Sequence, residues 1–257
     1  MIFYDLKLST KNWRFIHLLG VTNLRSRYSR SKLGQTWLTL SFFIQIMSIG
    51  TVWSVLWKQP VLSFMPYVAL GMILYQFFSM IILESTTVFT NDSRLYMNQH
   101  LPFFTSIFSL IYKNTLVFLH NIPILILFLV ISGAHANASL LMVYGFILLC
   151  FFLTSCAYVL ACLCTRYRDM IQIINSVMNA LFLVTPIMWN IEQIPQQWRA
   201  YFFMNPLAAF LEIFRNPLLD LPVNYFAYVS ATSWASLTVG LMFFLYHRFE
   251  KRIIYWI

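Results

Sequence analysis

Of the 257 residues in this chain, 60% are hydrophobic and only 10% are charged. Soluble domains carry about a quarter charged residues, so the composition excludes an ordinary soluble protein. The net charge of +9 lies beside apolar stretches, which favours contact with anionic membrane lipids over nucleic-acid binding. We therefore expect membrane lipids, and no nucleic acid, among the partners.

Residues 1–32 form a basic cytoplasmic segment ahead of the first long apolar stretch. As a helix, this segment places Trp13 and Leu24 on one side, with Arg14 and Arg25 opposite. We expect an amphipathic helix in the plane of the inner lipid headgroups, acting either as a plain anchor or as a collar at the cytoplasmic mouth of a channel. The segment lacks the compact apolar run of a cleavable signal peptide, so the first span is expected to remain in the mature protein.

Uncharged intervals locate the membrane spans of the remaining domain, residues 33–257. A helix needs about 20 apolar residues to cross the hydrocarbon layer. The interval 114–165 is long enough for two spans joined by a turn at 133–137. The sequence therefore predicts an all-α membrane protein with six transmembrane helices. They are expected at approximately residues 34–57, 65–90, 105–132, 138–163, 170–189 and 225–246.

The positions of Lys and Arg give the expected orientation, because cytoplasmic loops carry an excess of both. With the N-terminus inside, 13 of the 17 basic residues lie in inner segments, and three, Lys58, Arg199 and Arg215, lie in outer segments. We therefore expect a multi-pass protein of the bacterial inner membrane with both termini in the cytoplasm.

Two charged residues, Glu84 and Lys113, lie inside predicted spans. A charge within the membrane is costly and points to pairing or to function. Both residues lie about 10–12 Å from the inner ends of two adjacent antiparallel spans, at 1.5 Å of rise per residue. We expect them to form an ion pair. The alternative is that Lys113 reaches inward to the headgroups alone, while Glu84 faces a water-filled lumen.

Residues 190–224 are the most irregular part of the sequence, with four prolines close together. The apolar stretch from Pro206 to Arg215 favours a helix but is too short to cross the membrane. We expect short re-entrant helices between spans five and six, on the periplasmic side.

Aromatic residues are abundant, with 8 Trp, 14 Tyr and 25 Phe. Trp and Tyr at span ends are typical of the interfacial belt of a membrane protein. Aromatic residues at span centres, such as Phe42, Tyr75 and Phe77, either contact lipid and neighbouring helices or line a channel. The sequence leaves these alternatives open.

No sequence motif indicates an enzyme. The sequence contains no Gly-x4-Gly-Lys-Ser/Thr loop, which cradles nucleotide phosphates, so we do not expect this chain to hydrolyse ATP. The four cysteines lack a recognisable metal-ligand spacing and are expected to pack between helices. We expect no catalytic residue, cofactor or metal in this chain. The cysteines are Cys150, Cys156, Cys162 and Cys164.

Two stretches carry a family resemblance. Arg27-Tyr-Ser-Arg-Ser-Lys-Leu-Gly-Gln-Thr-Trp37 resembles the basic segment that leads into the first span of ABC-2 type polysaccharide-export permeases. The second stretch resembles the fifth span and the outer re-entrant helices of the same family, and its Thr-Pro-Ile-x-Trp form is closer to the O-antigen and teichoic-acid branch than to the capsule branch. It comprises Arg168-Asp169, Thr185-Pro-Ile-Met-Trp189, Asn205-Pro-Leu207 and Phe214-Arg-Asn-Pro-Leu-Leu219.

The resemblance implies a channel-forming subunit of an exporter for a lipid-linked polysaccharide, with O-antigen, a part of lipopolysaccharide, as the expected cargo. It implies a homodimer driven by two copies of a separate ATPase, which bind ATP and Mg, and an undecaprenyl-linked substrate. The family has a cytoplasmic gate, a coupling helix docked on the ATPase between spans two and three, and re-entrant helices that narrow the periplasmic exit.

These roles fall on specific residues of this chain. The coupling segment is 91–104, for which a plain solvated loop is the alternative. The gate residues are Arg25, Arg27, Tyr28, Arg30 and Trp37; the coupling residues are Asp92, Arg94 and His100; the exit residues are Pro186, Trp189, Asn205, Pro206 and Arg215.

Two other functions remain open at this point. An ABC-2 permease for a drug, lipid or antibiotic would have the same fold. A secondary transporter or channel that works without ATP is less well supported, because the sequence has neither an inverted repeat nor several intramembrane carboxylates.

Overall fold

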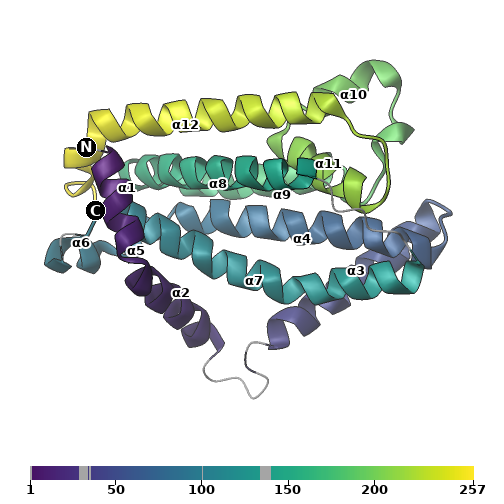
Figure 1. The fold of residues 1–257 in the computed structure, drawn as a ribbon, viewed down its shortest axis with the longest axis horizontal. Coiled ribbons are helices and arrows are strands. Elements are labelled where there is room, and N and C mark those ends of the chain that lie inside the picture. The colour runs from purple at the N-terminus through teal and green to yellow at the C-terminus, as the bar shows by residue number, and fades with distance from the viewer. Residues whose placement is uncertain (1, 29–33, 35, 100, 134–139) are drawn as a thin grey trace.

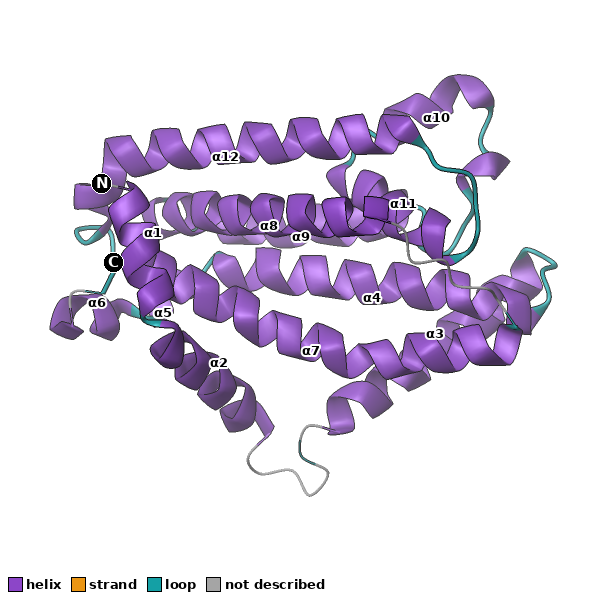
Figure 2. Cartoon of the chain, in the orientation of Figure 1, coloured by secondary structure: helices purple, strands orange, loops and turns teal. Residues whose placement is uncertain are grey.

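The computed structural model describes residues 2–28, 34, 36–99, 101–133 and 140–257. Throughout these residues the secondary structure is helical and no strand occurs, as Figure 2 shows. The expected all-α architecture is therefore confirmed. Most of the turn expected at 133–137 lies outside the described residues, but Gly133, at φ 68°, ends the preceding helix in the left-handed conformation that glycine adopts readily.

Among the described residues, five helices are long and apolar enough to cross a membrane. At 21 to 30 residues each, they exceed the length that the hydrocarbon layer requires. They correspond to five of the six predicted spans. They are α3 (Thr36–Leu56), α4 (Val61–Ser85), α7 (Phe103–Ser132), α8 (Leu140–Arg166) and α12 (Tyr225–Ile253).

The remaining predicted span, 170–189, contains a shorter helix. Helix α9 (Met170–Val184) has 15 residues and is therefore about 22 Å long, which is less than the roughly 30 Å of the hydrocarbon core. It ends at Thr185, whose φ of −76° and ψ of 138° are extended. Pro186 contributes to this ending, because a proline ring disfavours the helical conformation of the residue before it. The segment 185–189 continues without regular structure.

The long helices lie side by side in one bundle, with α12 along one edge and α7, joined by α3, on the opposite side (Figure 1). Helix α4 is the central helix. In its most apolar stretch of 18 residues, 67% of the residues are buried, against 22% to 50% in the corresponding stretches of the other four helices. It packs against α3, α7, α8, α9 and α11. Both described termini lie at one end of the bundle (Figure 1), which we call the terminal end; the opposite end is the far end.

Short helices close the two ends of the bundle (Figure 1). At the terminal end lie α1 and, between α4 and α7, helices α5 and α6; α2 follows α1 and packs along α7. At the far end, three short helices separate α9 from α12. The short helices are α1 (Ile2–Lys11), α2 (Trp13–Tyr28), α5 (Val88–Asn91), α6 (Ser93–Gln99), η1 (Ile191–Gln193), α10 (Gln196–Phe202) and α11 (Pro206–Leu218).

Candidate functional site

Glu84 on α4 and Lys113 on α7 lie together between the two helices. Lys113 Nζ is 2.7 Å from Glu84 Oε2, and Asn114 Nδ2 donates to the same oxygen at 2.8 Å. Both charged side chains are largely shielded, with exposed fractions of 18% for Lys113 and 28% for Glu84. The carboxylate thus has a cation and an amide donor at hand, which offsets much of the cost of removing both charges from water.

A second polar link between the same helices was not predicted from the sequence. Asn121 Nδ2 donates to Gln76 Oε1 at 2.7 Å, about two turns from the ion pair along each helix. The sequence did contain a sign of this bond: Gln76 and Asn121 are amide side chains within apolar stretches, and each needs a hydrogen-bond partner when it is buried. The two links fix the register of α4 against α7.

The predicted coupling segment forms two short helices, α5 and α6, at the terminal end. Arg94 is exposed and Asp92 is partly buried; His100 lies outside the described residues. Burial raises the pKa of Asp92, whereas a hydrogen bond with Ser106 and the charge of Lys113 lower it. The same lysine that pairs with Glu84 therefore acts electrostatically on the coupling segment.

Aromatic rings attach this segment to the bundle. Tyr96 on α6 packs on Phe103 at the start of α7, with ring centroids 4.6 Å apart, and on Phe89 of α5 at 6.0 Å. Phe89 in turn contacts Tyr158 of α8 at 5.9 Å. Because Phe89 and Tyr96 are almost fully buried, a force on α5 or α6 reaches α7 and α8 through close packing.

The predicted gate residues lie around α2 and the start of α3. Arg25 and Trp37 are exposed; Arg30 lies outside the described residues, and only the backbone of Arg27 and Tyr28 is described, as part of α2. Arg25 lines a cavity of about 1,100 Å³ between α2, α3 and α7.

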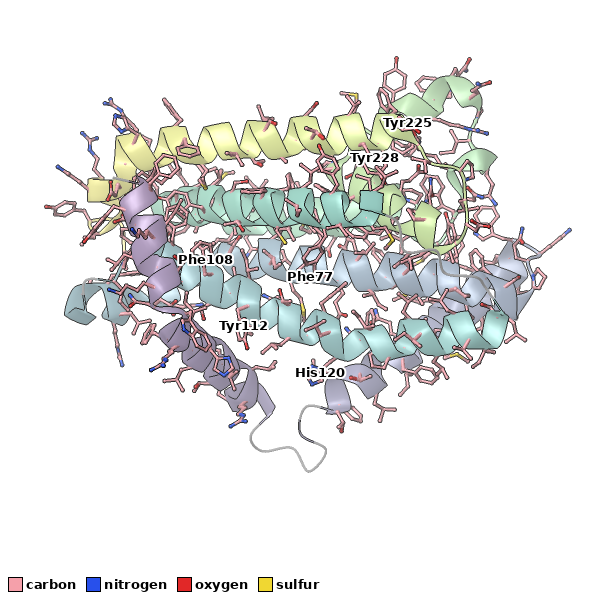
Figure 3. The ribbon with its side chains drawn as sticks, viewed as in Figure 1. Phe77, Phe108, Tyr112, His120, Tyr225 and Tyr228 are labelled. Atoms are coloured by element: carbon pink, nitrogen blue, oxygen red, sulfur yellow. The ribbon has the colours of Figure 1, made fainter. Side chains whose placement is uncertain are left out.

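Helix α2 packs obliquely along α7. His17 Nδ1 lies 2.6 Å from the Tyr112 hydroxyl, and Leu24 is buried beside Val117; Figure 3 labels Tyr112 and His120 on α7. Of the two apolar residues placed together on one side of this helix, Leu24 is 4% exposed and Trp13 is 62% exposed. The buried stripe of α2 thus follows its contact with α7.

Arg215 on α11 is a buried cation among the predicted exit residues. It is only 3% exposed, and its guanidinium donates to the carbonyl oxygens of Pro186 at 2.6 Å and of Ile187 at 3.3 Å. It also donates to the carbonyl oxygen of Tyr67 on α4 at 3.3 Å, while its Cζ lies 3.6 Å from the centre of the Tyr67 ring. One side chain thus joins α4, α11 and the segment after α9.

Every backbone carbonyl of the irregular segment 185–189 has a hydrogen-bond donor. Pro186 and Ile187 are served by Arg215, Met188 by Trp57 Nε1 at 3.2 Å, and Trp189 by the Tyr67 hydroxyl at 2.9 Å; the carbonyl of residue 185 accepts from the amide of residue 187. Unpaired backbone groups are costly in an apolar surrounding. This set of donors explains how the segment remains non-helical among apolar helices.

The other exit residues fix the start of α11. Asn205 caps the helix through its side-chain oxygen, which accepts from the Leu207 amide at 3.0 Å, and Pro206 occupies the first turn, where proline is favoured. Asn205 Nδ2 also donates to Thr185 Oγ1 at 2.8 Å. The indole of Trp189 donates to the carbonyl oxygen of Leu183 at 3.3 Å. These side chains therefore gather around the end of α9.

The ABC-2 type transporter family model matches residues 15–219. The chain belongs to the ABC-2 type transporter family. The matched region runs from α2 to the end of α11 and so includes every predicted site residue. As a member of this family, the chain is a permease subunit of a multi-pass membrane transporter, and membership implies an ATPase partner.

Two curated relatives extend the similarity over nearly the whole chain. Both are named O-antigen export system permease protein RfbA and come from Klebsiella pneumoniae. They are 24% and 23% identical to this ABC-2 chain over 245 and 244 residues. Each alignment covers 91% of this chain and 93% of the relative.

Within the described residues, no cluster of three or more His, Cys, Asp or Glu side chains could hold a metal ion. The four cysteines are free thiols. Of these, Cys162 and Cys164 are buried and Cys150 and Cys156 are partly buried in α8.

Proposed function

We propose that this chain is the channel-forming subunit of an ABC exporter that moves a lipid-linked polysaccharide, with O-antigen as its cargo, across the bacterial inner membrane. The observation that carries the proposal is the end-to-end similarity to two permeases named for O-antigen export, over 91% of this chain. The sequence has no phosphate-binding loop of its own, so the energy comes from ATP and Mg bound to a separate ATPase.

In this proposal six spans cross the membrane. Helix α9 and the segment 185–189 together form the fifth, and the set of donors around 185–189 is what such a span requires, because non-helical backbone at membrane depth must have all its polar groups paired. The terminal end faces the cytoplasm and the far end faces the periplasm, in agreement with the distribution of Lys and Arg. Helices α10 and α11 are then the re-entrant helices at the exit, and α1 and α2 form the N-terminal interface segment.

The transporter is a homodimer with two ATPase subunits, and the glycan is undecaprenyl-linked. Closure of the ATPase dimer on ATP pushes α5 and α6, which are attached to α7 and α8 through Phe89 and Tyr96. Because Glu84 and Lys113 tie α4 to α7, the two helices move as one body. The movement opens a channel between the two copies, and the glycan passes toward the periplasm.

The test begins with purification of the tagged full-length chain from its native cells in mild detergent. We expect a protein with Walker motifs to co-purify in about equimolar amount. Deletion of the gene should remove the glycan from the cell surface and cause lipid-linked glycan to accumulate in the cytoplasm, and a plasmid copy should restore export. Surface glycan that persists in the deletion strain would refute the cargo, and transport by this chain alone without ATP would refute the exporter mechanism.

A further inference from the structure

A cavity of about 600 Å³ lies at the far end of the chain, between η1, α10, α11 and the start of α12. Small-molecule sites measure roughly 300–1,000 Å³, so this one has room for a sugar ring. A second cavity, of about 370 Å³, adjoins it, and the two share Tyr67, Asn190 and Leu221 in their walls. Together they form one cleft across the far end, which we call the far-end cleft.

The floor of the cleft is polar and held in place. Glu212 is only 9% exposed, and its Oε2 accepts from Asn216 Nδ2 at 3.4 Å and from Asn224 Nδ2 at 3.0 Å. Beside it, Arg215 directs its terminal nitrogens to backbone carbonyls. Its Nε finds no hydrogen-bond acceptor among the described residues, although a buried N–H normally has one. The floor therefore presents a carboxylate that its hydrogen bonds hold in place, beside the buried guanidinium of Arg215.

The walls of the cleft combine aromatic rings with amides. Phe203 and Phe226 pack together with ring centroids 5.9 Å apart, and Tyr225, labelled in Figure 3, is 74% exposed at the rim. Aromatic faces pack against the C–H faces of a sugar ring, and side-chain amides bond to the hydroxyls on its edge. The lining amides are Gln59, Asn190, Gln193, Asn216 and Asn224, and the further aromatic residues are Trp57, Phe64 and Tyr67.

The charges of the cleft point to an uncharged ligand. An anion would meet the carboxylate of Glu212, and the terminal nitrogens of Arg215 are already engaged by three carbonyls. Arg199, the other cation of the lining, donates its Nε to the carbonyl oxygen of Ile194. A lipid chain fits better elsewhere, because the cavity between α2, α3 and α7 has a mostly apolar lining that includes Leu40, Leu119 and Leu127. A neutral molecule rich in hydroxyl groups matches the far-end cleft best.

We infer that the far-end cleft is a saccharide-binding site within each subunit, which holds one or two sugar rings of an uncharged glycan. This inference rests on the proposed function, which supplies the cargo and places the far end at the periplasm. Glu212 and the amides bond the hydroxyls, and Phe226 and Tyr225 cover one face of the ring. Because the glycan is held where it leaves the membrane, its return into the channel is hindered.

The experiment measures binding of defined probes to the full-length chain with its ATPase in nanodiscs. The probes are lipid-free oligosaccharides of one and two repeat units, released by mild acid from the surface glycan of the native cells. Saturation-transfer NMR should show saturable binding. Phe226→Leu and Tyr225→Leu should each raise the Kd at least fivefold, since both rings lie at the rim and are 51% and 74% exposed, so their loss leaves the fold intact. Glu212→Gln should raise it at least tenfold.

Matched controls lie on α12, the helix that carries Tyr225 and Phe226. Phe244→Leu, at a residue 63% exposed on α12, and Glu250→Gln, near the terminal end of α12, should leave the Kd unchanged. Absence of saturable binding, or binding that the three cleft variants do not weaken, would overturn the inference. The deletion strain reports on the proposed function separately: loss of surface glycan on deletion, together with no binding at the cleft, rejects the site and leaves the exporter standing.

Discussion

Arg215 Nη1 donates to the carbonyl oxygen of Pro186 over 2.6 Å, and this bond joins two parts of the chain that are 29 residues apart. The proline ends α9 and leaves a non-helical segment, and the arginine supplies donors to two of the carbonyls that the helix no longer pairs. Tyr67 and Trp57, from α4 and the end of α3, supply two more. A broken helix and a buried cation, each costly alone, stabilise one another at the far end.

Gly71 on α4 is the position where this junction tolerates no side chain. A Cβ at Gly71 would lie 2.5 Å from Arg215 Nη2 and 3.0 Å from the Ile187 carbonyl oxygen. We expect Gly71→Ala to lower the free energy of unfolding by about 1–3 kcal/mol, the usual cost of overpacking. Thermal unfolding in detergent, followed by size-exclusion chromatography, measures the loss.

Gly240→Ala on α12 is the matched control, because nothing lies within 4 Å of a Cβ at that position. Both substitutions carry the same gain in helix propensity, about 1 kcal/mol, so the difference between them isolates the clash. Equal stability of the two variants would show that the contact between α4 and Arg215 is looser than described.

The Glu84–Lys113 pair should respond to charge reversal as a unit. Glu84→Lys or Lys113→Glu alone places two like charges together, and we expect each to lower stability by about 3 kcal/mol, the lower end for breaking a shielded pair. The double reversal restores opposite charges and should recover most of the folded protein. The yield of monodisperse protein and its melting temperature give the coupling energy of the double-mutant cycle.

Lys58→Glu, at an exposed position between α3 and α4, is the control for a change of charge away from the pair and should have little effect. If the double reversal is no better than the single ones, the two side chains do not depend on each other, and Lys113 acts alone at the headgroups.

Helix positions and the placement of one ion pair were accessible from the sequence for simple reasons. Charges are rare in apolar spans, so two at equal depth on adjacent antiparallel helices have few other partners. The Gln76–Asn121 bond could not be predicted, because a neutral amide can lie almost anywhere along a span. The burial of Arg215 could not be predicted either, because it depends on Tyr67, 148 residues away. Such tertiary contacts leave no local pattern in the sequence. The packing of α2 on α7 is hidden for the same reason.

Asp92 should make stability depend on pH in the acid range. Burial raises its pKa above the usual 3.8, in spite of the opposing effects of Ser106 and Lys113. A carboxyl group with a raised pKa binds its proton more tightly when folded, so its contribution favours folding at low pH and is lost as the pH rises from about 3.8 through the folded pKa. Asp92→Asn has no proton to lose at this position, so the variant does not undergo this loss of stability as the pH rises.

Melting temperatures of the wild type and of Asp92→Asn, compared from about pH 4 to pH 7, provide the measurement. The variant should gain stability relative to the wild type as the pH rises through this range. A difference between wild type and Asp92→Asn that does not change with pH would mean that Asp92 titrates as it does in water.

Helix α6 should carry the contact with the ATPase. Its Arg94 and Met97 are exposed, whereas Tyr96 is buried and attaches the helix to the bundle; a partner therefore meets Arg94 and Met97 first.

Loss of an interface residue that matters typically costs more than about 1 kcal/mol, or roughly a factor of five in affinity. We expect Arg94→Glu and Met97→Asp each to reduce co-purification of the ATPase by about fivefold or more, with normal folding of the permease. Arg168→Glu, in the exposed turn between α8 and α9, changes the same charge at the terminal end and should leave the complex intact. If the α6 variants retain the ATPase in full, the partner docks on another part of the terminal end and α5 and α6 do not transmit its movement.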